Sequence, residues 1–242
     1  MTYCVGLLLK AGMVLLSDTR TNAGLDNIAT YRKMFIFEDP GERVITIMTA
    51  GSLSVTQTTI ARLQEASSDN PAADGTTCIL KATTMLQVAE IVGRTLAQVT
   101  GEIADKLSTM KQAATASMIV AGQRRGGGMR MFLIYPEGNF IEATEDTPFL
   151  QIGEHKYGKP ILDRVVTPDT TLEEAQKAVL LSMDSTLRSN LSVGMPLDLA
   201  VIEEGAFCVG KRRRIEAGDP AFAEMSDAWS TALRDAFRII KV

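Results

Sequence analysis

Short runs of apolar residues separated by turn residues dominate the first fifty positions. Tyr3–Leu9 and Met13–Asp18 flank the turn Lys-Ala-Gly, and Met34–Phe37 and Val44–Thr49 flank the turn Glu-Asp-Pro-Gly. Apolar runs of this length around Gly and Pro turns are typical of β-hairpins. We therefore predict that the chain begins with two hairpins.

The spacing of apolar residues then changes to that of helices. Between Ser52 and about Ser67 the apolar residues recur every three or four positions, which predicts a helix. After a loop at Asn70–Gly75, the stretch from Cys78 to about Leu107 predicts one long helix or a pair of helices. A helix is predicted at about Leu172–Leu187, where two Glu residues in the first turn suit the helix dipole, and another begins at about Pro220.

Strands return between these helices. The remaining apolar runs predict six more strands: Ala116–Gln123, Met129–Tyr135, Phe140–Ala143, Phe149–Ile152, Leu197–Glu203 and Phe207–Arg213. Strands and helices thus come in separate clusters, and this order favours antiparallel sheets with helices packed outside them over alternating βαβ units. We expect one domain over residues 1–242, with two stacked sheets between helical layers.

Composition and charge exclude several classes of function. The net charge is −4 and the isoelectric point is about 5.2, which argues against a nucleic-acid partner. No apolar run reaches the roughly 18 residues of a membrane span and no leader is evident, so we expect a cytoplasmic protein without a membrane partner. The cysteines Cys4, Cys78 and Cys208 are expected to be reduced and buried. His155 is the single histidine of the chain. A zinc cluster built from several histidines is therefore excluded, and there is no choice of histidines from which to assemble a Ser-His-Asp triad. We expect no metal or cofactor.

Three polar residues at the ends of predicted strands suggest a chemical site. The first hairpin returns Asp18 toward Thr2, and the strand that follows Lys33 can bring its ammonium beside them. A threonine hydroxyl is a weak nucleophile unless a base activates it, and an N-terminal α-amine, with a pKa of about 8, can be that base without histidine. Lys33 would then stabilise the alkoxide, and Asp18 would hold Lys33 in place. The scheme requires removal of Met1; the alternative is that each residue simply faces water.

Several motifs resemble those of proteasome β-subunits, which are N-terminal-nucleophile hydrolases. They are Thr2, SDTR at 17–20, Lys33 and TAGS at 49–52. Longer segments resemble the bacterial Anbu (ancestral β-subunit) family over nearly the whole chain: TYCVGLLL at 2–9, SDTRTNAG at 17–24, IGEHKYGKPILDR at 152–164 and STLRSNLSVGMPLDLAV at 185–201. The resemblance implies an α+β fold, a four-layer αββα sandwich, and a threonine peptidase assembled as a ring or open spiral.

The resemblance also implies roles for individual residues. Thr2 matches the nucleophile, and Asp18 and Lys33 match the charged residues beside it. Gly51 matches the glycine whose backbone N–H forms the oxyanion hole, a role that suits a residue opening a helix, where N–H groups lack partners. Arg20 completes the Asp-Thr-Arg motif.

Three other positions depart from the proteasome pattern. Ser192 stands where proteasomes have a supporting serine, but the nearest acidic residue upstream, Asp184, is more distant than in the family. Glu154 occupies the place of a second supporting serine, where a carboxylate can alter the pKa of the terminal amine. We therefore expect weak or conditional activity, with these three residues and Arg20 as supporting candidates.

The expected partners follow from the same resemblance. It implies a homo-oligomer that acts on peptides or unfolded proteins, and leaves open whether an unfoldase docks. Two groups of apolar residues are candidates for subunit contacts: Met85, Leu86, Val88, Ile91, Val92 and Leu96 in the stretch 78–107, and Phe222, Trp229, Leu233, Phe237 and Ile240 on the terminal helix. For the terminal helix, packing on the chain's own sheet is the alternative. The basic run Lys211–Arg214 predicts an exposed or subunit-contacting strand edge. Two alternatives remain open: an amidase that acts on a small amide or peptide tag, and a catalytically idle ring scaffold.

Overall fold

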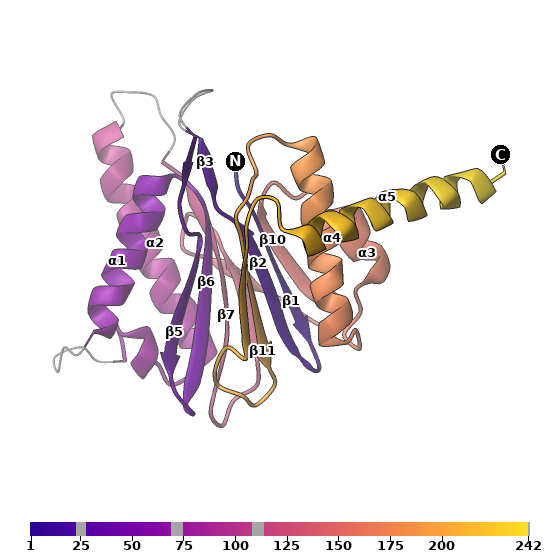
Figure 1. Cartoon of the computed structure of the whole chain (residues 1–242). Coiled ribbons are helices and arrows are strands. Elements are labelled where there is room, and N and C mark those ends of the chain that lie inside the picture. Colours follow the sequence, from indigo (N-terminus) through magenta and orange to yellow (C-terminus); the bar gives the residue numbers. More distant parts are fainter. Residues whose placement is uncertain (23–27, 69–74, 108–113, 242) are drawn as a thin grey trace.

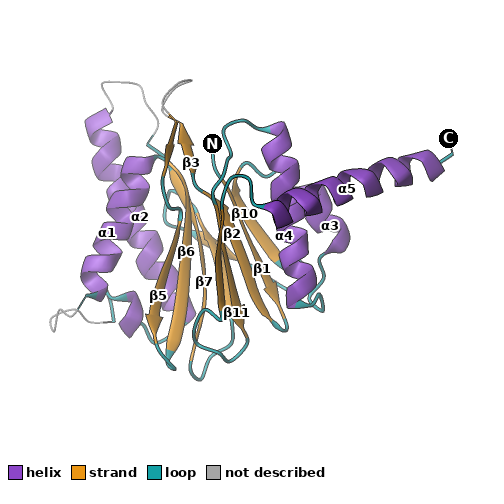
Figure 2. Cartoon of the chain, viewed as in Figure 1, coloured by secondary structure: helices purple, strands orange, loops and turns teal. Residues whose placement is uncertain are grey.

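Two antiparallel β-sheets lie face to face between two layers of helices (Figure 1, Figure 2). The structure is a computed structural model that describes residues 1–22, 28–68, 75–107 and 114–241. Helices α1 (Leu53–Ser67) and α2 (Met85–Leu107) cover one outer face, and α3 (Lys159–Val165) and α4 (Leu172–Ser189) cover the other. The αββα sandwich implied by the family resemblance is confirmed. The predicted loop at 70–75 falls almost wholly outside the described residues.

The first sheet carries the start of the chain in its interior. Its strand order is β10 (Phe149–Gly153), β1 (Tyr3–Leu9), β2 (Gly12–Asp18), β11 (Leu197–Glu203) and β12 (Lys211–Ile215), and each pair of neighbours is antiparallel. Because side chains alternate along a strand, every second residue of β1 faces the helices and the others face the second sheet. The hairpin predicted for β1 and β2 is confirmed, and both of these strands are buried along nearly their whole length.

The second sheet is built from the middle of the chain. Its order is β5 (Met34–Asp39), β6 (Arg43–Gly51), β7 (Ala116–Arg124), β8 (Arg130–Ile134) and β9 (Phe140–Glu142). All five strands follow the sequence prediction. A separate two-stranded ribbon, β3 (Arg20–Asn22) with β4 (Ile28–Thr30), was not predicted.

The helical layer over the second sheet comprises α1 (Leu53–Ser67), a short 3₁₀ turn η1 (Ile79–Lys81) and α2 (Met85–Leu107). The predicted element from Cys78 onward is therefore a 3₁₀ turn followed by one long helix. Five of the six apolar residues predicted to make subunit contacts pack in the core of this same chain (Met85, Val88, Ile91, Val92 and Leu96), and the sixth, Leu86, is exposed. The prediction that part of this apolar surface faces a neighbouring subunit is therefore wrong for the five buried residues, and Leu86 stays a candidate.

The opposite layer contains α3 (Lys159–Val165), α4 (Leu172–Ser189) and α5 (Pro220–Ile239). Helix α4 begins with a capping box, in which Thr171 and Glu174 satisfy each other's backbone N–H groups. Helix α5 starts against α4 and then projects away from the body of the molecule (Figure 1). No helix within the described residues is both long enough and apolar enough to cross a membrane.

The segment 204–210 corrects two further expectations. The last strand was predicted at Phe207–Arg213, but β12 spans Lys211–Ile215, and the apolar residues before it lie in a loop. That loop is tied to the second sheet, because Val209 N donates to Glu38 Oε1 at 2.7 Å. Cys208 lies in this loop and is exposed, whereas Cys4 and Cys78 are buried as expected; all three are free thiols.

Candidate active site

Thr2 is fixed at the head of β1 by main-chain contacts on both sides. Its carbonyl oxygen accepts a hydrogen bond from Glu154 N at 2.6 Å, and the next backbone N–H, that of Tyr3, donates to Asp18 Oδ1 at 3.1 Å. Gly153 has φ +81°, and a Cβ there would lie 2.0 Å from the Thr2 carbonyl oxygen. Only glycine therefore allows this approach. Thr2 is 8% exposed.

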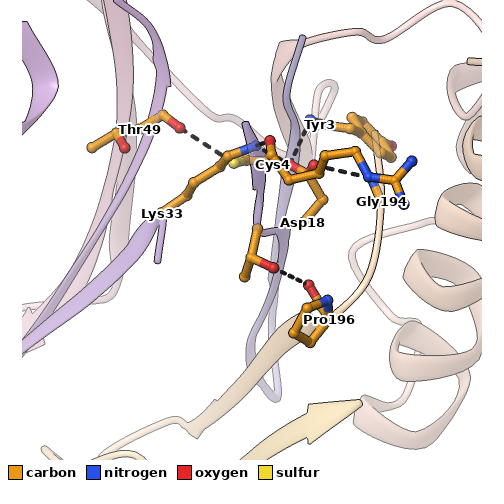
Figure 3. Close-up of polar contacts among 9 residues, drawn as sticks. Tyr3, Cys4, Asp18, Lys33, Thr49, Gly194 and Pro196 are labelled. Carbon is orange, nitrogen blue, oxygen red and sulfur yellow. Dashed lines mark hydrogen bonds and ion pairs between the residues drawn. The ribbon is translucent and has the colours of Figure 1, made fainter. Parts of the chain in front are cut away.

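A buried ion pair lies beside this strand end. Lys33 Nζ is 2.6 Å from Asp18 Oδ1, and the two side chains are 7% and 0% exposed (Figure 3). Lys33 also donates to the carbonyl oxygen of Arg20 at 2.6 Å, and Gly194 N donates to Asp18 Oδ2 at 3.2 Å. Burial raises the pKa of Asp18, and the Lys33 ammonium and the two N–H donors oppose this rise. Every contact of Asp18 thus joins a different segment of the chain.

The α-amino group at position 1 is electrostatically coupled to this pair. Burial lowers the pKa of the Met1 α-amine, the charge of Lys33 lowers it further, and Asp18 opposes both effects. A lower pKa means that a larger fraction of the amine is neutral near pH 7. Only the neutral amine can accept a proton.

An open pocket of about 280 Å³ adjoins Thr2, and we call it the Thr2 pocket. Its walls include Thr2, Lys33 and Gly51. Gly51 is the last residue of β6, with φ +109°, and a Cβ there would lie 2.4 Å from the carbonyl oxygen of Thr115. It precedes Ser52, the N-cap of α1, so the predicted oxyanion-hole residue sits at the strand-to-helix junction rather than in the helix.

The supporting candidates divide between the site and its surroundings. Arg20 lines the Thr2 pocket, and its Nη1 donates to the carbonyl oxygen of Leu191 at 2.9 Å. Ser192 lies in the adjoining loop, where its N–H donates to Asn190 Oδ1 at 2.9 Å. Glu154 accepts from Asn190 Nδ2 at 3.1 Å and from Lys156 N at 3.0 Å. Glu154 therefore organises the loop that packs behind Thr2.

Asp184 lies elsewhere, which corrects its inclusion among the site candidates. Its carboxylate accepts from Ser226 Oγ at 2.7 Å and from Arg188 Nε at 3.2 Å. It thereby fastens α5 to α4 and does not line the Thr2 pocket. The nearest acidic residue upstream of Ser192 is thus a structural residue of the helical layer.

Sequence reasoning missed two groups of residues near the site. The hydroxyl of Tyr3 contacts Ser182 Oγ and Gln151 Nε2, each at 2.6 Å, and burial raises its pKa to about 12. These bonds anchor the start of β1 against α4 and β10. Arg32 and Asn22 line the Thr2 pocket. The alternation of apolar residues gave no signal for them, because one lies in a loop and the other in the three-residue strand β3.

Comparison with known proteins gives a consistent result. A family model described as proteasome subunit matches residues 2–202. The chain is similar to the solved structure of Anbu (ancestral beta-subunit) from Yersinia bercovieri, with 40% identity and a TM-score of 0.91 over 99% of this chain and 98% of that one. An Anbu (Gly-1) mutant from Hyphomicrobium sp. strain MC1 gives 48% identity and a TM-score of 0.91 over 100% and 99%. The helical assembly of the Anbu complex from Pseudomonas aeruginosa gives 42% and 0.91 over 99% and 97%. A comparison with curated proteins gives no match.

Proposed function

Because the chain belongs to the proteasome-subunit family, among the Anbu (ancestral β-subunit) proteins, we propose that it hydrolyses peptide bonds with Thr2 as the nucleophile. Thr2 becomes the N-terminal residue once Met1 is removed, and a side chain as small as threonine permits that removal. The observation that carries the proposal is the buried Lys33–Asp18 pair beside the fixed strand end of Thr2. The subunits are proposed to work in the cytoplasm as a homo-oligomer.

The first half of the proposed reaction forms an ester. The Thr2 hydroxyl oxygen attacks the substrate carbonyl carbon and gives its proton to the α-amine, which Met1 removal creates on the same residue. Lys33 stabilises the developing alkoxide, and Asp18 keeps the ammonium oriented. The backbone N–H of Gly51 stabilises the oxyanion. When the tetrahedral intermediate collapses, the C–N bond breaks and the leaving amine takes the proton from the α-ammonium.

The second half returns the enzyme to its starting state. Water attacks the ester carbonyl while the α-amine accepts a proton from it, and collapse releases the carboxylic acid and restores the hydroxyl of Thr2. The neutral α-amine of Thr2 is the base in both steps. No histidine is required.

An assembly is supported by the terminal helix. The distal half of α5 and its C-cap residue expose Phe237, Ile239 and Ile240 at 80%, 77% and 71% of their surface. Large apolar side chains grouped on one projecting element mark an interaction surface. The Pseudomonas aeruginosa relative is described as a helical assembly. We therefore propose that the distal half of α5 contacts a second copy of the chain, in a ring or open spiral.

Covalent labelling tests the nucleophile. We expect a peptide epoxyketone to add to protein that has lost Met1, and intact-mass measurement locates both changes. Thr2→Ala should abolish labelling and hydrolysis, and Thr2→Ser should retain part of both because it keeps a hydroxyl beside the amine. Thr231→Ala, an exposed threonine on α5, is the matched control. Peptide hydrolysis by Thr2→Ala at the wild-type rate would contradict the mechanism.

Light scattering tests the assembly separately. Multi-angle light scattering of tag-free protein at micromolar concentration should give a mass several times that of one subunit. Replacing Phe237 and Ile240 by Ser should lower that mass without unfolding the subunit. A monomer of 26.2 kDa in wild type would favour an amidase that acts on small amides.

A further inference from the structure

The charged residues in the wall of the Thr2 pocket are all cations. Arg20, Arg32 and Lys33 line it, and none of the described residues in its wall carries a carboxylate. A pocket walled by one sign of charge attracts ligand groups of the opposite sign. The three cations differ, however, in whether their side chains already make ion pairs or hydrogen bonds within the protein.

Two of the three cations are committed to internal contacts. Lys33 is paired with Asp18 at 2.6 Å. The guanidinium of Arg20 donates to the carbonyl oxygen of Leu191 and packs against Gly194, where a Cβ would lie 2.1 Å from its Nε. Neither side chain can turn toward a ligand without breaking these contacts.

Arg32 is the cation left for a ligand. It lies in the loop immediately before Lys33, is exposed, and forms no ion pair or hydrogen bond with any described residue. An arginine guanidinium binds a carboxylate in a bidentate manner, which gives both charge and shape selection. Phe35 and Leu53 add apolar surface to the same pocket, suited to the methylene groups of a substrate side chain.

We propose that the Thr2 pocket selects peptides with an acidic side chain on the residue whose carbonyl Thr2 attacks, and that Arg32 is the residue that binds this carboxylate. The proposal rests on the proposed function, because it names the substrate class of the same site. It assigns to Arg32 a role in specificity and none in bond cleavage.

Four peptide epoxyketones that differ only in the residue carrying the reactive group test this proposal. That residue is Asp, Asn, Leu or Lys, and the labelling rate of the intact oligomer is followed by mass. We expect Asp to label at least about tenfold faster than its neutral isostere Asn, the effect of one charge-assisted contact. Arg32→Gln should remove this ratio, and Arg32→Glu should make Lys the faster of the charged compounds.

Arg164→Glu, an exposed charge reversal on α3 outside the pocket, is the matched control and should leave the ratio unchanged. Labelling by all four compounds at equal rates, or an Asp preference that survives Arg32→Gln, overturns the assignment and leaves Thr2 as the nucleophile. Labelling by none of the compounds overturns the proposed function and this proposal with it.

Discussion

Two buried aspartates mark two regions of the molecule that are held together in different ways. Asp18, at the end of β2, takes N–H bonds from Tyr3 and Gly194 and an ion pair from Lys33, three residues far apart in the sequence. Asp184, in α4, binds one hydroxyl of α5 and an arginine on its own helix. The Asp18 carboxylate joins three separate segments of the chain, and the Asp184 carboxylate fastens two helices.

The difference shows how a candidate catalytic ion pair can be distinguished from a contact that only fastens two helices. The partner of Asp18 is a buried ammonium, whose charge the protein must desolvate and then balance. The charged partner of Asp184 is 56% exposed, so its charge stays largely hydrated. A protein that retains a fully buried ion pair next to an open pocket keeps a charge where a reaction can use it.

Replacing Lys33 should have the largest effect. Lys33→Ala removes the ammonium that stabilises the alkoxide, so peptide hydrolysis should fall about 100-fold or more while the subunit stays folded. Lys33→Arg should fail nearly as badly, because a planar guanidinium does not fit the place of a compact ammonium. Rates measured on purified oligomers, with circular dichroism for the fold, check this. An active Lys33→Arg enzyme would move Lys33 from the chemistry to the structure.

Asp18→Asn should come next. The amide keeps the size of the side chain but removes the counter-charge of a buried ammonium, which costs about 3 kcal/mol of unfolding free energy. The ammonium also loses the carboxylate that keeps it oriented, so peptide hydrolysis should fall too. Urea unfolding at one protein concentration and peptide hydrolysis measure the two effects. Unchanged stability would show that Asp18 does not hold the ammonium.

Asp184→Asn should affect stability and hardly affect activity. Loss of the charge weakens the bonds to Ser226 and Arg188, which should cost about 1 kcal/mol, with hydrolysis within about twofold of wild type. The variant is also the matched control for Asp18→Asn. A loss of activity as large as that of Asp18→Asn would return Asp184 to the site.

Ser226→Ala should have the smallest effect. It removes the hydroxyl shared by Asp184 and Arg188, but those two side chains still contact each other at 3.2 Å. We expect a loss of less than about 1 kcal/mol and no change in the substrate turnover rate. In a double-mutant cycle with Asp184→Asn, the two losses should be less than additive.

The sequence predicted the first hairpin and the return of Asp18 toward Thr2, because the geometry of a tight turn determines both. A tight turn brings the end of β2 back beside the start of β1, whatever the rest of the chain does. Asp184 could not be placed in the same way. Its role depends on Ser226, in a helix that the sequence separates from it by 42 positions.

The other errors have the same physical origin. The ribbon β3–β4 has strands of three residues, too short to show alternation, and α3 has seven residues, too few for a helical period. Phe207 and Val209 have the composition of a strand but lie in a loop, where Val209 N donates to the side-chain Oε1 of Glu38 and not to a neighbouring strand. The sequence could not single out Arg32 as a ligand-binding cation, because only the folded structure shows that Lys33 and Arg20 already have partners within the protein.

The clamped backbone of Thr2 also limits when the nucleophile can be made. The N–H of Tyr3 is bound to Asp18, and the carbonyl of Thr2 is bound to Glu154. An aminopeptidase needs a free, extended N-terminal segment. In the folded protein such a segment becomes available only when the part of the sheet around Thr2 unfolds locally. In the proposed mechanism Met1 is therefore cut off during translation, long before residue 154 has been synthesised. The fraction of active subunits then depends on whether Met1 is removed before the chain folds. Rapid overproduction should therefore yield inactive subunits that retain Met1.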